Sequence, residues 1–199
     1  MLSRIYWLCI KTFRNHSEKK TLRHPQAKES LRSEFIEALD QLKQKHPIVY
    51  LDESGFKSHD YRPHGYSPRG TPCYGSFNWQ LKNQTNAIGA LYQGQLFAVG
   101  LFDCKINSNV FHFWVEQFLI PELPQNSVIV MDNAAFHKRS DIQELLEHYG
   151  HQILWLPAYS PDLNSIEKTW AWIKKKRKEW QEDCIDRLFQ MFFHVCMSN

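Results

Sequence analysis

The sequence lacks any cysteine pattern that would organise a fold or a metal site. Its five cysteines are far apart, their number is odd, and no two of them form a C-x-x-C pair. They are Cys9, Cys73, Cys104, Cys184 and Cys196. The pattern excludes a disulfide framework and a cysteine-ligated zinc site, and it favours a reducing compartment.

Long apolar runs are also missing. The early run IYWLCI, at Ile5–Ile10, is far shorter than the roughly 20 residues that span a bilayer, and no small-residue cleavage site follows it. We therefore expect no signal peptide, no membrane segment and a cytoplasmic location.

The chain has no strong charge of one sign. Its 24 Lys and Arg against 21 Asp and Glu give a net charge of +3, which identifies no acidic partner. The basic residues do gather, at 11–28 and again at 174–178. Such clusters suit a phosphate backbone, but a solvated helix face explains either cluster equally well.

What is present indicates one α/β domain. The chain has 199 residues without internal repeats, and Leu31, Phe35, Leu39 and Leu42 follow a helical spacing that predicts a helix over 30–45. Before it we expect a short helix and a basic connector. After it, the apolar run at 48–51 predicts a buried strand that stops at Asp52, Glu53 and a Ser-Gly turn.

The remaining elements alternate in type. A turn-rich connection or an edge hairpin at 57–80 precedes a second hairpin signal, in which TNAIGALY and LFAVGLF flank QGQ with Gly94 in the turn. Further along we expect helices over 109–119, 140–149 and about 163–180, and strands at SVIVMD and HQILWLP. This order predicts a mixed sheet.

Three carboxylates stand at predicted element boundaries: Asp52 and Asp132 after strands, and Glu167 at the start of the last helix. Carboxyl ends of neighbouring strands lie side by side, so the three side chains can share one crevice, where a hard divalent cation such as Mg²⁺ would offset their repulsion. Each also has an ordinary explanation. Aspartate is common in turns, and Asn164 with Glu167 resembles a capping box.

Three sequence blocks carry a more specific signal. VYLDESGF, VIVMDNAAFHK and LPAYSPDLNSIEKTWAWIKKK closely resemble the signature blocks of DDE transposases of the mariner superfamily, in particular its bacterial insertion-sequence branch. Residues 133–166, which separate Asp132 from Glu167, number 34, as in that family. The resemblance covers Lys20 to Arg187. Ser165 departs from it, because the family usually has proline there, and we expect a looser helix start.

The resemblance implies a ribonuclease H-like fold, with a mixed five-stranded sheet flanked by helices. It assigns Asp52, Asp132 and Glu167 as catalytic ligands of two Mg²⁺ or Mn²⁺ ions. It also places four supporting residues near them: Asn133, His137, Asp162 and Asn164. A packing role explains His137 equally well, and strand alternation predicts that Glu53 points away from the crevice of Asp52.

The implied activity is hydrolytic nicking of double-stranded DNA at a transposon end, followed by transfer of the freed 3′ end to target DNA, with a homodimer as the expected assembly. Expected phosphate contacts are Arg62, Arg69, Lys174, Lys175, Lys176 and Arg177. Trp79, Trp170 and Trp172 are candidates for stacking on bases, although aromatic residues at helical spacing more often belong to the core.

The expected organisation is a catalytic domain over 46–199. Residues 1–45 are expected to be the remnant of a DNA-binding region of a truncated copy, since the family's helix-turn-helix units have no counterpart here. Two alternatives stay open. One is a non-catalytic DNA-binding or regulatory remnant, and the other is a cellular nuclease of the ribonuclease H-like fold.

Overall fold

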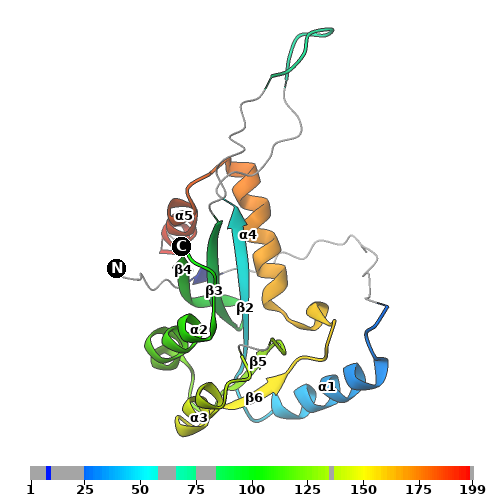
Figure 1. The fold of residues 1–199 in the computed structure, drawn as a ribbon, viewed down its shortest axis with the longest axis vertical. Coiled ribbons are helices and arrows are strands. Elements are labelled where there is room, and N and C mark those ends of the chain that lie inside the picture. The colour runs from blue at the N-terminus through cyan, green and yellow to red at the C-terminus, as the bar shows by residue number, and fades with distance from the viewer. Residues whose placement is uncertain (1–7, 10–24, 58–65, 75–83, 135–136, 198–199) are drawn as a thin grey trace.

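A mixed β-sheet forms the centre of the molecule (Figure 1). The structure, a computed structural model, describes residues 8–9, 25–57, 66–74, 84–134 and 137–197. The strands are β1 (Leu8–Cys9), β2 (Ile48–Lys57), β3 (Gln84–Tyr92), β4 (Gln95–Phe102), β5 (Val128–Met131) and β6 (Gln152–Trp155). They lie in the order β1-β4-β3-β2-β5-β6. The expected five-stranded mixed sheet is confirmed, and the two-residue β1 extends it where a short helix had been expected.

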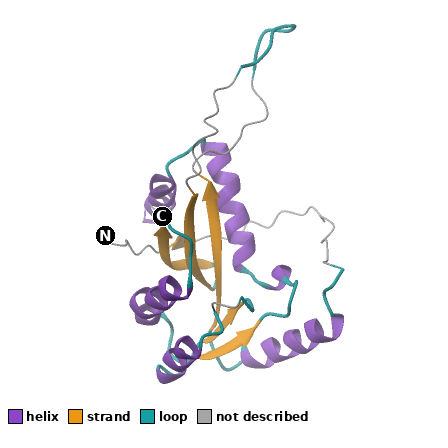
Figure 2. Ribbon diagram, viewed as in Figure 1, coloured by secondary structure: helices purple, strands orange, loops and turns teal. Residues whose placement is uncertain are grey.

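Helices cover both faces of the sheet (Figure 2). They are α1 (Glu29–Leu42), α2 (Ser108–Trp114), α3 (Ser140–His148), α4 (Ile166–Trp180) and α5 (Ile185–Met197). One apolar cluster packs α2 and α3 against alternate residues of the strands, among them Val49 and Leu51 of β2. A second packs α4 and α5 against the other face, which includes Phe56. Because side chains alternate along a strand, successive residues of β2 pack against helices on opposite faces of the sheet.

The central strand β2 is longer than predicted. It continues past Asp52 to Lys57, because β3 pairs with it in antiparallel register from Tyr50 to Lys57. Ser54 and Gly55 therefore lie within the strand and make no turn. A Cβ at Gly55 would stand 2.3 Å from Nε2 of Gln84, the end of a flexible side chain that would have to move aside.

The parallel partner β5 is short. Its pairing with β2 ends at Tyr50 opposite Val130, so Asp132 follows the end of β5 at the level of Asp52. The register of two neighbouring strands thus brings both aspartates to one edge, as the sequence predicted.

The hairpin of β3 and β4 is confirmed. Gln93 and Gly94 connect the strands with φ angles of 50° and 79°. Two positive φ values are the requirement of the tight turn whose twist matches a hairpin. This hairpin supplies the antiparallel half of the sheet beside β2.

Other boundaries differ from the predictions. The helix expected over 109–119 changes at Val115 into a π-helical turn, Val115–Leu119, followed by a 3₁₀ turn, Ile120–Glu122, whose Pro121 has no N–H to continue an α-helix. The helix expected from about 163 begins at Ile166, and α5 was not predicted. Among the described residues, no helix combines the length and apolar character needed to cross a membrane.

Candidate active site

The three predicted carboxylates line one pocket. Asp52 comes from β2, Asp132 from the end of β5, and Glu167 from the first turn of α4. The pocket has a volume of about 320 Å³, and its other walls come from residues 133–134 and from the loop 156–164. Elements far apart in the sequence therefore bring these three acids together, as expected.

Among the three carboxyl groups, the surroundings of Asp52 raise its pKa the most. Burial, followed by the charges of Glu167, Glu53 and Asp132, raises its pKa to about 8. Burial also raises the pKa of Glu167, where Lys174 opposes the shift and Asp132 adds to it. Two carboxyl groups of the pocket therefore resist ionisation together, as acids do when they share a site.

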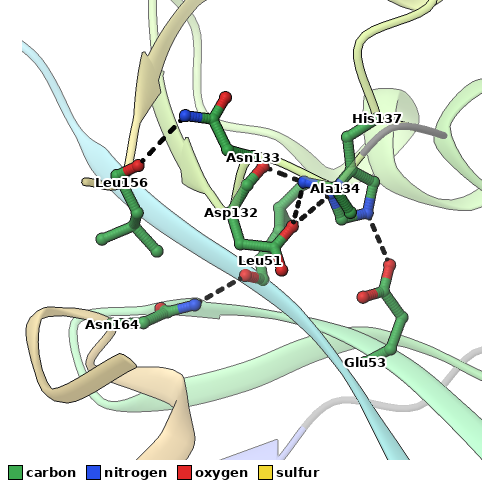
Figure 3. A network of polar contacts seen from close by, with 8 residues as sticks. All are labelled: Leu51, Glu53, Asp132, Asn133, Ala134, His137, Leu156 and Asn164. Atoms are coloured by element: carbon green, nitrogen blue, oxygen red, sulfur yellow. Dashed lines mark hydrogen bonds and ion pairs between the residues drawn. The ribbon is translucent and has the colours of Figure 1, made fainter. Parts of the chain in front are cut away.

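Asp132 is stabilised as a carboxylate by His137 (Figure 3). The imidazole Nδ1 lies 2.7 Å from Asp132 Oδ1, and its Nε2 lies 2.8 Å from Glu53 Oε1. Because each ring nitrogen faces a carboxylate oxygen, both nitrogens donate and the ring is an imidazolium. Burial alone would lower the pKa of His137, but the bonds to Asp132 and Glu53 outweigh it and raise the pKa to about 9. In return, the bond from His137 lowers the pKa of Asp132.

His137 also packs against α2, the helix that covers this face of the sheet. Its ring centroid lies 4.4 Å from that of Phe111, and its side chain is 2% exposed. Both readings of this residue, active-site support and packing, therefore describe its surroundings. Glu53 does not line the pocket, as alternation predicted, but its contact with His137 was not foreseen.

Asn164 fixes the loop that leads to Glu167. Its side-chain amide donates a hydrogen bond of 2.9 Å to the carbonyl of Leu51, the residue before Asp52 (Figure 3). The capping-box alternative is wrong, because α4 begins after Ser165 without a side-chain cap. Ser165, which stands where the family usually has proline, makes no side-chain cap either, and the looser helix start expected from it stays a prediction. Asn164 instead ties the loop directly to β2.

Asp162 is held from the other side by a residue that the sequence did not single out. Both of its carboxylate oxygens accept hydrogen bonds from Arg32 of α1, at 2.9 and 2.7 Å. Asn133 makes a long contact of 3.5 Å to the carbonyl of Leu156. The contacts of Asp162 and Asn164 therefore hold the pocket loop in place on α1 and on β2.

The predicted DNA contacts divide into several groups. Lys174, Lys175 and Lys176 lie along one stretch of α4, where Lys174 lies 5.5 Å from the ring centroid of Phe56 and the other two pair with Glu179. Arg69 is exposed, while Arg62 and Trp79 lie outside the described residues.

Two of the expected contacts are corrected. Arg177 is 5% exposed, and its guanidinium donates to the carbonyls of Glu182 and Asp183, so it closes the end of α4 and is unavailable to a phosphate. Trp170 is 1% exposed and belongs to the core, so it has no face for a base. Trp172 packs against Phe192.

The donor set fits hard cations. Within the described ranges, no three His, Cys, Asp or Glu side chains are positioned as a ligand group. The pocket nevertheless gathers three oxygen donors whose mutual repulsion a cation would relieve. The hydrogen bonds from His137 and from the Ala134 amide are both accepted by Oδ1 of Asp132. Neither of these two bonds uses Oδ2, the second oxygen of that carboxylate.

Comparison with known proteins identifies the family. A family model described as DDE superfamily endonuclease matches residues 47–188, which include all three carboxylates. The chain belongs to this family. No match was found among curated proteins.

Solved structures agree with the DDE assignment at the level of the fold. The Mos1 transposase paired-end complex with left transposon end has a TM-score of 0.59 and 18% identity, over 92% of this chain and 63% of that one. The catalytic domain of Mos1 mariner transposase has a TM-score of 0.52 and 18% identity, over 87% and 91%. The chain thus spans less than two thirds of the full Mos1 transposase chain but most of its catalytic domain. It has the ribonuclease H-like α/β fold that the sequence blocks implied.

Proposed function

We propose that this chain is the catalytic domain of a mariner-type DNA transposase, of the bacterial insertion-sequence branch, and that it nicks and transfers DNA strands. The observation that carries the proposal is the convergence of Asp52, Asp132 and Glu167 in one pocket. Burial and the neighbouring carboxylates raise the pKa of Asp52 and of Glu167, which is a cost to the metal-free fold. Such a group of carboxylates is useful where divalent cations and a phosphodiester meet.

Asp52, Asp132 and Glu167 would hold two Mg²⁺ or Mn²⁺ ions. When bound, such ions activate the attacking oxygen and stabilise the leaving oxygen of a phosphodiester. Crystal structures of the Mos1 paired-end complex with Mn and with Mg have the same fold at TM-scores of 0.58 and 0.54, which supports this choice of cation.

The chain's own residues have distinct parts in this proposal. His137 keeps Asp132 ionised and oriented through its short bond to Oδ1. Asn164 and Asp162 hold the loop that presents Glu167. Asn133 lines the pocket beside Asp132, where its amide can orient the substrate.

The proposed substrate is double-stranded DNA, both the transposon end and the target. Lys174 lies two helical turns after Glu167 on the same face of α4, and its charge opposes the rise in the pKa of Glu167, so we propose Lys174 and its neighbours Lys175 and Lys176 as phosphate contacts beside the pocket. Arg69 and Arg62 are proposed as further phosphate contacts. We also propose a homodimer, by analogy with the paired-end complex of Mos1.

We propose that the catalytic domain extends over 46–199. Helix α1 precedes it in the sequence but packs on its sheet through Phe35, so we propose that α1 is part of the same folded unit. The residues that precede α1 are proposed as part of the DNA-binding region.

The test is metal-dependent nicking by the purified chain. Supercoiled plasmid and a labelled duplex of the transposon's terminal repeat would be incubated with Mn²⁺ or Mg²⁺, with Asp132→Ala as the active-site variant. Asp186→Ala, at an exposed position in the first turn of α5, is the matched control. Nicking by wild type and control that disappears in Asp132→Ala supports the proposal.

Two results would overturn it. Folded wild-type protein that binds DNA but never nicks with either metal would favour a regulatory remnant. Cleavage confined to RNA–DNA hybrids or four-way junctions would favour a cellular nuclease.

A further inference from the structure

Arg32 is a buried cation in a helix that precedes the family match. It lies in α1 and is 4% exposed, and its two terminal nitrogens each donate to one oxygen of Asp162, 130 residues away in the sequence. This is the bidentate geometry in which arginine and carboxylate bind most specifically. The contact joins α1 to the 3₁₀ turn Pro161–Leu163 of the pocket loop.

Apolar packing accompanies the ion pair. Phe35, one turn after Arg32, packs with Val130 of β5 and with Leu156, where the pocket loop begins. Leu39 and Leu163 border the same cluster. The helix therefore contacts the loop at its first residue and again at its 3₁₀ turn.

The loop has a second anchor on its other side. Asn164, two residues after Asp162, is bonded to the carbonyl of Leu51 in β2. The backbone N–H of Glu167 then donates to the carbonyl of Asn164. Between α1 and β2, the last residues before Glu167 are thus fixed at two points, and the first turn of α4 starts from the second of them.

The pair is half-buried, because the Arg32 side chain is 5% exposed and that of Asp162 is 29% exposed. The cost of desolvating the guanidinium offsets much of the attraction between the two charges, so stability alone is a weak reason for this pair. What the Arg32–Asp162 pair supplies in addition is a fixed direction and distance. A catalytic carboxylate requires its position to be held within about half an ångström.

We infer that Arg32 is a positioning residue for Glu167, and that α1 is part of the catalytic unit although the family match begins at residue 47. Arg32 acts through Asp162 and does not touch the substrate. The inference rests on the proposed function in one respect, that Glu167 is a metal ligand. It predicts that a substitution in α1 changes the chemistry of a pocket that α1 does not line.

The test compares Arg32→Met, Arg32→Lys and Asp162→Asn in the full chain. Arg177→Met is the matched control, since Arg177 is equally buried and also donates its guanidinium hydrogens, but at the far end of α4. Three quantities are measured: Mn²⁺ affinity by calorimetry, hydrogen exchange of residues 156–167 in the metal-free chain, and nicking rate per folded molecule.

We expect Mn²⁺ affinity and nicking to fall about 10–100-fold in Arg32→Met and in Asp162→Asn, as when outer-shell partners of a metal site are removed. Exchange of 156–167 should quicken in both, while the KM for DNA stays close to that of the wild type. Arg32→Lys, which keeps the charge without the bidentate fork, should recover part of the loss. The double variant Arg32→Met/Asp162→Asn should fall no further than the worse single one.

Arg177→Met should lower the melting temperature without changing Mn²⁺ affinity or exchange in 156–167. The inference is overturned if Arg32→Met behaves in the same way as this control. Exchange requires neither metal nor DNA. A wild-type chain that neither binds Mn²⁺ nor nicks would refute the proposed function, while the exchange data would still decide whether Arg32 holds the loop.

Discussion

Asp52 should make the metal-free protein less stable than it would be with a neutral side chain. The carboxyl group is half-buried beside Glu167, and its pKa is about 8, against an ordinary value of 3.8. Asp52→Asn replaces it with an amide of the same size that carries no charge in either state. We therefore expect this substitution in a catalytic position to stabilise the fold.

The sign follows from proton binding. Between pH 3.8 and 8 the folded chain keeps a proton on Asp52 that the unfolded chain has released, so this group's contribution is fully present below pH 3.8 and is lost as the pH rises towards 8. At about 1.4 kcal/mol per pH unit, the loss by pH 7 has an upper limit of roughly 4 kcal/mol. Relaxation and water entry reduce such values, so we expect a gain of about 1–3 kcal/mol in Asp52→Asn.

Thermal melts in EDTA would measure this gain. A chain of this size shifts its Tm by about 2–4 °C for each kcal/mol, and the difference between Asp52→Asn and wild type should be larger at pH 8 than at pH 5. Asp40→Asn, at an exposed position on α1 where the carboxylate pairs with Lys43, is the control for the loss of one carboxylate outside the pocket.

Excess Mn²⁺ should reverse the order. A ligand present at about 100 times its Kd stabilises by roughly 2.7 kcal/mol, and the variant has lost one of the proposed donors. Wild type should therefore gain in Tm while Asp52→Asn does not. A variant that melts below wild type at pH 8 in EDTA would refute the reasoning, because the half-buried carboxyl would then be a favourable partner in the metal-free fold.

Two further substitutions test the supports of the pocket. Asn164→Ala leaves the Leu51 carbonyl without its side-chain donor, so we expect a loss of about 1–3 kcal/mol in denaturant unfolding together with weaker Mn²⁺ binding; unchanged Mn²⁺ affinity would show that this bond serves stability alone. Gly89 is paired with Asp52, and a Cβ there would stand 3.1 Å from the Trp170 ring. Gly89→Val should therefore destabilise by about 1–3 kcal/mol through overpacking, measured by thermal melts, with the smaller Gly89→Ala as its comparison; a loss in Gly89→Ala as large as that in Gly89→Val would contradict the packing argument.

The parts of the site that could be predicted from sequence depend on local rules. Predicted strand ends and a helix start brought Asp52, Asp132 and Glu167 together, because the carboxyl ends of adjacent strands coincide. The grouping is right although β2 runs on past Asp52, since Asp52 still lies level with the end of β5. The hairpin at Gln93 and Gly94 followed from turn chemistry. These features are encoded within a few residues of where they occur.

The length of β2 was missed for a different reason. Asp52, Glu53, Ser54 and Gly55 have the composition of a turn, but β3 supplies a complete set of antiparallel partners for them. Tertiary pairing overrode local preference, as it commonly does in strands. The consequence is functional, since a central strand holds Asp52 more firmly than a turn would.

Arg32 was missed although a signal for it exists. The spacing of Leu31, Phe35 and Leu39 predicts them as the buried face of the first helix, yet Leu31 is 45% exposed. Arg32, Phe35 and Leu39, with spacings of 3 and 4, fit the buried face better and place a charge on it. A cation at a core position indicates a buried partner, but no local rule identifies Asp162, 130 residues away.

The three carboxylates differ in the contacts that hold them in place against their mutual repulsion. Asp52 lies in a strand that is paired on both sides, and Asp132 is neutralised by a histidine that also bonds to Glu53. Glu167 has neither of these restraints. It is carried by a helix whose start is fixed by Asn164, and by Arg32 acting through Asp162. Variation outside the pocket should therefore reach the chemistry at two carboxylates, at Glu167 through Arg32 and at Asp132 through His137, because a single substitution can remove either contact.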